Sequence, residues 1–218
     1  MRSFISYNTS DKILAGKIKQ SLEQFGFSTF LAHDDIKPTQ AWVERILDEL
    51  NKSDVFLPLL TSSFHKSIWT LQEVGIAIGQ GIYVIPLKVN TNPVGFLGQF
   101  QALKIRSTNL KKSAVEIAHV VSKNPNLRRQ FLNDLIKMYE ASSSFDEAID
   151  GLHQLNLFEG YTSSQVNAVI KAGLDSNQIY RFWDPERELD KFVQSNKKVA
   201  NVYLVRAHLF RKSNSNAG

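Results

Sequence analysis

Two short apolar runs constrain the fold of this chain more than any other feature of its sequence. Residues 55–60 read Val-Phe-Leu-Pro-Leu-Leu, and residues 82–87 read Ile-Tyr-Val-Ile-Pro-Leu. Runs of this length without a polar alternation are typical of strands that are covered on both faces of a parallel sheet. We therefore predict buried strands over 54–60 and 82–89.

Strands and helices are predicted to alternate through the first half of the chain. Further short strands are expected at 4–7, 27–31 and 102–105. Apolar residues recur at helical spacing over 13–25, 41–50 and 68–80. Ser10 is expected to cap the first of these helices, with Ile13 on its apolar face. This order predicts an α/β fold with a flavodoxin-like five-stranded parallel sheet and helices on both faces.

The second half of the chain shows only helical patterns. They cover 115–122, 127–139, 145–157, 164–172, 176–183 and 185–211. We therefore expect an α/β domain over 1–122 and a small all-α extension over 123–212. Residues 213–218 are expected to be a disordered tail.

Composition excludes several classes of site and location. The chain contains no cysteine, so disulfides, thiolate metal sites and cysteine nucleophiles are excluded. Its five histidines are scattered, and we expect neither a bound metal nor a resident cofactor. No apolar run approaches the length of about 20 residues that a membrane span needs, and the N-terminus lacks the apolar core of a secretory signal. We expect a soluble, cytoplasmic protein without a membrane partner.

The end of the chain is basic, although the whole chain has a formal charge of only +5. Residues 191–218 contain six lysines and arginines and no acidic residue. Such an end could contact an acidic partner or nucleic acid. A solvated terminal helix explains the same pattern, and nucleic acid is not an expected partner.

The residues with the most chemical potential follow the strands at their carboxyl ends, where sheets of this class bind ligands. Trp69 and Glu73 are four residues apart, so a helix places them on one face, one turn apart. An indole beside a carboxylate could hold a nucleotide ring and stabilise a positive charge that forms on a sugar. Ser6 and Tyr7 follow the first strand and could contact ribose or phosphate.

Three segments of the chain resemble the Toll/interleukin-1 receptor (TIR) domain family. Phe4-Ile5-Ser6-Tyr7 resembles the family's first conserved box, and residues 30–38 resemble its second box and the long loop that follows. The segment Ser67-Ile68-Trp69, followed by Glu73, resembles the part that carries the glutamate of NAD-cleaving members. The resemblance covers roughly residues 1–120. Thr39 stands where a glycine commonly follows the loop proline.

The resemblance implies a TIR fold and a bacterial, NAD-cleaving enzyme. It assigns Glu73 as the catalytic carboxylate, and adds Asp35, Pro38 and Trp42 to Ser6, Tyr7 and Trp69 as substrate-binding residues. NAD⁺ would be the substrate, and ADP-ribose or a cyclic ADP-ribose isomer the product. The resemblance further implies self-association through the TIR domain, and anti-phage defence in which the nucleotide product signals to an effector protein.

Two other functions remain open at this point. The chain could be a non-enzymatic TIR–TIR adaptor, although an adaptor does not need the pair of Trp69 and Glu73. It could also be a nucleoside-processing transferase, because related sheet folds use a carboxylate to cleave nucleosides. A dinucleotide-binding oxidoreductase is disfavoured, since no glycine-rich phosphate loop follows the first strand.

Overall fold

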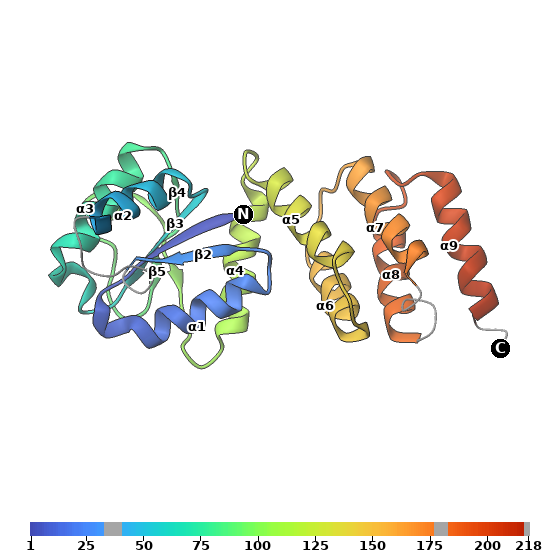
Figure 1. Cartoon of the computed structure of the whole chain (residues 1–218), viewed down its shortest axis with the longest axis horizontal. Coiled ribbons are helices and arrows are strands. Elements are labelled where there is room, and N and C mark those ends of the chain that lie inside the picture. The colour runs from blue at the N-terminus through green and yellow to red at the C-terminus, as the bar shows by residue number, and fades with distance from the viewer. Residues whose placement is uncertain (33–40, 177–182, 216–218) are drawn as a thin grey trace. The chain divides into compact units, whose positions relative to one another are not determined.

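The computed structural model describes residues 1–32, 41–176 and 183–215. Its Cα positions divide into two compact units, Met1–Val121 and Ser122–Gly218. The first unit contains the sheet, and the second unit is entirely helical over its described residues (Figure 1). The predicted site residues Asp35 and Pro38 lie outside the described residues.

The first unit contains a parallel sheet. Its strands are β1 (Arg2–Ser6), β2 (Ser28–Leu31), β3 (Val55–Leu60), β4 (Tyr83–Val84), β5 (Leu87–Lys88) and β6 (Leu103–Lys104). Every pairing is parallel, and the strand order is β2-β1-β3-β5-β6, with β4 also paired to β3. This is the flavodoxin-like order with five strand positions, which confirms the predicted fold class.

The fourth strand position is interrupted, whereas the sequence predicts one continuous strand over 82–89. Tyr83 and Val84 pair with β3, the ladder stops, and pairing resumes at Leu87 in the same register. Pro86 lies in the gap. Because proline has no backbone N–H, it cannot donate to the neighbouring strand, and the ladder is broken there.

Helices cover both faces of this sheet. They are α1 (Lys12–Glu23), α2 (Ala41–Asn51), α3 (Ile68–Gly79) and α4 (Leu110–Lys123), joined by 3-10 turns at Thr9–Asp11, Phe64–Lys66 and Gly95–Gln99. Phe4 pairs in register with Phe30 and Phe56, with ring centroids 5.3 and 5.8 Å from its own. These three rings belong to the core that also includes Ile46 of α2 and Val74 of α3. Since successive side chains of a strand alternate, every second residue of β1 faces this core.

The start of the first helix differs from the prediction. Asn8 caps the preceding 3-10 turn, where its side chain accepts a hydrogen bond from the backbone N–H of Ser10. Asp11, not Ser10, occupies the N-cap position of α1, and its side chain makes no capping hydrogen bond. Ile13 is 76% exposed and does not contribute to the core. A 3-10 turn precedes α1 and moves the helix start to Lys12. Helical spacing alone does not reveal this shift of the apolar face.

The second unit contains helix pairs that pack in two rows. Its helices are α5 (Arg128–Glu140), α6 (Phe145–Leu155), α7 (Ser163–Asp175), α8 (Trp183–Ser195) and α9 (Val202–Ser215). Helices α5, α7 and α9 form one row and α6 and α8 the other, with α5 against α6 and α7 against α8 (Figure 1).

Two predictions for this unit need correction. The single helix expected over 185–211 is two helices, because α8 ends at Ser195 and α9 begins at Val202. Asn201 lies at the break, and its side-chain oxygen accepts the backbone N–H of Tyr203 at 2.8 Å, which caps the new helix. Helix α9 runs to Ser215, three residues into the segment expected to be disordered. Most of the helix expected over 176–183 lies outside the described residues.

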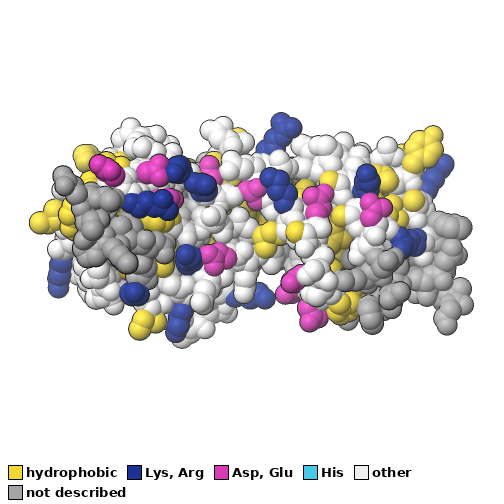
Figure 2. All heavy atoms as spheres, in the orientation of Figure 1, with side chains coloured by type: hydrophobic (Ala, Val, Ile, Leu, Met, Phe, Trp, Pro, Cys, Tyr) yellow, Lys and Arg dark blue, Asp and Glu magenta, His cyan; other side chains and the backbone are white. Residues whose placement is uncertain are grey.

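Hydrophobic side chains reach the surface of both units (Figure 2). Examples are Ile13, Ile68 and Leu71 in the first unit and Val202 and Tyr203 in the second. None of the described helices has the length and apolar character needed to cross a membrane.

Candidate functional site

Glu73 lies in the buried stripe of α3. The residues of this stripe are Thr70, Glu73, Val74 and Ala77, spaced so that they share the helix face that packs on the sheet. Glu73 is only 1% exposed. A carboxylate at an apolar position of a buried helix face is rare, because removing its charge from water is unfavourable.

Ser6 is the hydrogen-bond partner of this carboxylate. It is the last residue of β1 and faces the same side of the sheet as Phe4, two residues earlier. Its hydroxyl donates to Oε2 of Glu73 at 2.5 Å, and both side chains are buried. The other carboxylate oxygen, Oε1, has no hydrogen-bond partner within the described part of the chain.

The environment of Glu73 changes its pKa. Burial raises the pKa of Glu73 from 4.5 to about 7, and the hydrogen bond from Ser6 opposes part of this rise. Glu73 is the sixth residue of α3, beyond the first turn where a helix dipole acts on charge. Burial is therefore the dominant effect, and the group changes its charge near neutral pH.

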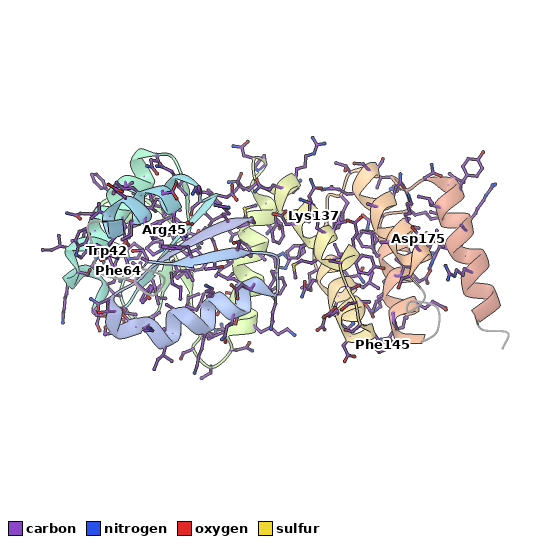
Figure 3. The ribbon with its side chains drawn as sticks, viewed as in Figure 1. Trp42, Arg45, Phe64, Lys137, Phe145 and Asp175 are labelled. Atoms are coloured by element: carbon purple, nitrogen blue, oxygen red, sulfur yellow. The ribbon has the colours of Figure 1, made fainter. Side chains whose placement is uncertain are left out.

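Trp69 contacts Trp42 and, unlike Glu73, is not buried. The two indole rings meet edge to face, with centroids 4.2 Å apart and planes at 81°. Trp69 remains 41% exposed, whereas Trp42 is half-buried against the core that contains Phe64 (Figure 3). The contact joins the first turns of α2 and α3 and places two aromatic rings beside the stripe that carries Glu73.

A polar network that the sequence did not predict joins two loops at the carboxyl edge of the sheet. Asp11 accepts hydrogen bonds from Thr61 and Ser63 at 2.6 Å each, and these two hydroxyls are 2.8 Å apart. The Asn8 side chain donates to the backbone oxygen of Ser63 at 3.2 Å. The sequence could have indicated this network, because all four residues lie in the segments that follow β1 or β3, and these strands are neighbours.

The other side chains that follow β1 and β3 are placed as follows. Tyr7 is completely buried after the end of β1. Half of His65 is buried, and within the described residues neither ring nitrogen has a hydrogen-bond partner, while Lys66 is exposed. The structure therefore brings Ser6 to Glu73 and Trp42 to Trp69, whereas Asp35 and Pro38 lie outside the described residues.

This arrangement can supply one carboxyl group, which is neutral or negatively charged depending on pH, beside an aromatic surface. A deprotonated Glu73 could accept hydrogen bonds from hydroxyl groups and offset a developing positive charge. The described residues contain no group of three or more histidines and carboxylates arranged to hold a metal ion. The chemistry that these residues themselves can perform is that of a single carboxylate.

Comparison with known proteins identifies one family. The TIR domain profile matches residues 4–119. Among solved structures, the TIR domain of the Toll-related receptor TRR-2 from Hydra magnipapillata is 18% identical, covering 56% of this chain and 98% of that one, with a TM-score of 0.47. A search of curated proteins returned no match. Because the profile matches more than half of this chain, the chain belongs to the TIR domain family.

Proposed function

We propose that this chain cleaves the bond between nicotinamide and ribose in NAD⁺, with Glu73 as the catalytic carboxylate. The observation that carries the proposal is the buried carboxylate whose pKa lies near 7. A carboxylate that is buried with one hydroxyl partner reduces stability, so its presence favours a functional role. NAD-cleaving TIR domains, which the sequence resembles, need one carboxylate at this place.

The reaction requires little from the protein beyond that charge. The C1′–N bond breaks with its electron pair going to nicotinamide, which leaves as a neutral base, so no strong general acid is needed. Positive charge develops on the ribose, as in glycoside hydrolysis, and ionised Glu73 stabilises it. Water then adds to C1′ and releases a proton, which gives ADP-ribose. Attack by a hydroxyl or ring nitrogen of the same molecule gives a cyclic isomer instead.

Ser6 acts in this proposal as a positioning residue. Its hydroxyl holds Oε2 of Glu73, which leaves Oε1 for the substrate. The two indoles of Trp42 and Trp69 supply surface on which a planar ring can stack. The product would serve as a nucleotide signal for a second protein in defence against phage.

Mass spectrometry of the products tests the proposal. Full-length protein incubated with NAD⁺ is expected to release nicotinamide together with ADP-ribose or its cyclic isomer. The Glu73→Gln variant, which can still accept the Ser6 hydrogen bond, should lose about 100-fold or more of the turnover. Glu188→Gln is the matched control, because it removes a buried carboxylate from the helical unit. Equal turnover in wild type and Glu73→Gln contradicts the proposal.

A second candidate function is an adaptor that binds other TIR domains. The observation that favours it is the apolar surface on the first turn of α3, where Ile68, Trp69 and Leu71 are all well exposed. Exposed apolar residues that lie together mark contact surfaces. An adaptor predicts no nicotinamide release at any protein concentration, together with loss of self-association in Ile68→Ser. Nicotinamide release that depends on Glu73 excludes a purely adaptor role.

A further inference from the structure

The helical unit contains two surfaces whose charges are opposite. Residues 140–190 contain ten acidic and three basic residues, whereas residues 191–218 contain six basic residues and no acidic one. Glu140 ends α5, and the other nine acidic residues lie in α6, α7, α8 and the connections between them, whereas the basic residues lie mostly in and before α9.

The first surface is the outward face of α9. Val205 and His208 are buried on the opposite face of this helix, which packs on α7. The outward face contains Val202, which is 61% exposed, and Tyr203, which is 79% exposed. Arg206 lies between Val202 and Leu209 on this face and makes no ion pair with any described residue. Hydrophobic and basic side chains occur together near the start of α9 in Figure 2.

Such a face is unusual for a helix that ends a row. In stacked helical arrays, each helix covers its neighbour, and a terminal helix needs a polar outer face for solubility. Within the described residues, α7 covers α5 and α9 covers α7, while α9 exposes large apolar side chains. The apolar and basic character of this face therefore indicates a contact surface.

The second surface is a groove between α5 and α7. It has a volume of about 520 Å³, which lies in the range of ligand-sized pockets. Small residues of α7, Ala168 and Ala172, form part of its lining. Glu140 and Asp175 add two carboxylates, and neither is paired with a cation among the described residues. Asp175 lies at the end of α7 (Figure 3).

We propose that the outward face of α9 in one molecule docks into the α5–α7 groove of a second copy. Tyr203 would pack on the small residues of α7, and Arg206 would pair with Glu140 or Asp175. A second copy is favoured over nucleic acid because phosphates offer nothing to Val202 and Leu209, whereas the groove of a second copy offers both small apolar residues and the carboxylates Glu140 and Asp175. Two different surfaces meet in this contact, so it is heterologous, and the assembly grows with concentration unless the ring closes.

Lys171 lies in the same groove and makes the proposal more specific. Its positive charge opposes the approach of Arg206, so the groove attracts α9 only through its surplus of negative charge. Replacing this lysine by an acidic residue should therefore strengthen self-association, which a nonspecific apolar contact would not do.

Sedimentation velocity of the full-length chain over a range of concentrations tests the proposal. Wild type is expected to self-associate, and Arg206→Glu to weaken association about tenfold. Lys111→Glu makes the same charge change on an exposed residue of α4 and should have no effect. Lys171→Glu should strengthen association. Circular dichroism melting checks that each variant is folded.

The charge exchange is the decisive measurement. Arg206→Glu combined with Asp175→Lys and Glu140→Lys should restore association, because the pair is rebuilt with reversed signs. A wild type that stays monomeric at all concentrations overturns the proposal. Association that Arg206→Glu leaves unchanged also overturns it, since another surface then carries the contact. Salt-sensitive binding of a single-stranded oligonucleotide that Arg206→Glu abolishes would assign this face to nucleic acid instead.

Discussion

Each unit of the molecule contains a buried glutamate, and the two have opposite surroundings. Glu188 of α8 is 3% exposed and lies within 4 Å of side-chain nitrogens of Lys191, Arg187 and His153. Burial raises its pKa, but the hydrogen bond and charge of Lys191 and the neighbouring cations outweigh burial and leave the pKa below its ordinary value. Glu73 has one hydroxyl partner and a raised pKa.

The surroundings of Glu188 fit a structural role, whereas those of Glu73 fit the proposed chemical role. A buried carboxylate that is fully paired holds its neighbours together and has no free capacity for a ligand. Glu73 keeps an unused oxygen and changes its charge near neutral pH, which are properties that a reaction can use. The following experiments break or sharpen this comparison.

The largest expected effect is a gain of stability in Glu73→Gln at alkaline pH. The folded pKa of about 7 exceeds the ordinary value of 4.5, so the folded state binds more protons, and stability falls as pH rises between these values. Above pH 7 the charged group lowers the free energy of unfolding by at most about 3 kcal/mol. Urea unfolding at several pH values should show the variant's advantage growing from acid to neutral pH. A constant difference would contradict the raised pKa.

Glu188→Gln should change the free energy of unfolding in the opposite direction. Its removal leaves cations without their partner, and we expect a loss of about 2 kcal/mol in the free energy of unfolding. The folded pKa is lowered, so this contribution is present above the ordinary value of 4.5 and disappears as pH falls below it. Urea unfolding at neutral and acidic pH measures both effects. NAD⁺ turnover should stay at the wild-type level.

Turnover should follow the ionisation of Glu73. Only the deprotonated form stabilises a positive charge on the ribose, so kcat/KM should rise about tenfold per pH unit below an apparent pKa near 7 and level off above it. Nicotinamide release measured from pH 5 to pH 9 checks this. A profile that is flat across neutral pH would assign the chemistry to another group.

Ser6→Ala should shift the pH profile of kcat/KM rather than abolish turnover. The Ser6 hydrogen bond lowers the pKa of Glu73, so its removal shifts the rise in kcat/KM to higher pH and reduces turnover a few-fold at neutral pH. Ser6→Thr keeps the hydroxyl and should restore the wild-type profile. A merely structural role for Ser6 would lower stability without moving the apparent pKa.

Trp69→Ala should weaken substrate binding with little effect on the chemical step. Its ring is partly exposed and contacts Trp42, and loss of a stacking surface should raise KM by about tenfold with kcat almost unchanged. Steady-state kinetics separate the two constants. A drop in kcat with constant KM would place Trp69 in the positioning of Glu73.

Patterns within single strands predicted the fold well. The apolar run of residues 55–60 depends on burial on both faces of a sheet, which is visible in sequence, and β3 lies at Val55–Leu60. Features that depend on neighbouring elements were not predictable in the same way. Whether Pro86 breaks the ladder depends on its partner strand β3, and the start of the first helix moves past Ser10 because a 3-10 turn capped by Asn8 precedes it.

The candidate site shows the same limit. The sequence placed Trp69 and Glu73 on one helix turn, but the direction of that face is decided by the sheet that α3 packs on. The structure buries Glu73 and leaves Trp69 partly exposed. The partnership of Ser6 with Glu73 joins residues 67 positions apart, and only the packed fold brings them together.

The edge-to-face contact of Trp42 and Trp69 provides an intrinsic spectroscopic probe of this part of the molecule. Two indoles whose centroids are 4.2 Å apart are close enough to couple electronically, and we expect this coupling to contribute to the circular dichroism spectrum. A planar molecule that slides against either ring changes the coupling at once. The proposed binding of NAD⁺ at α2 and α3 predicts a change in this signal on mixing, which can be recorded in unlabelled protein.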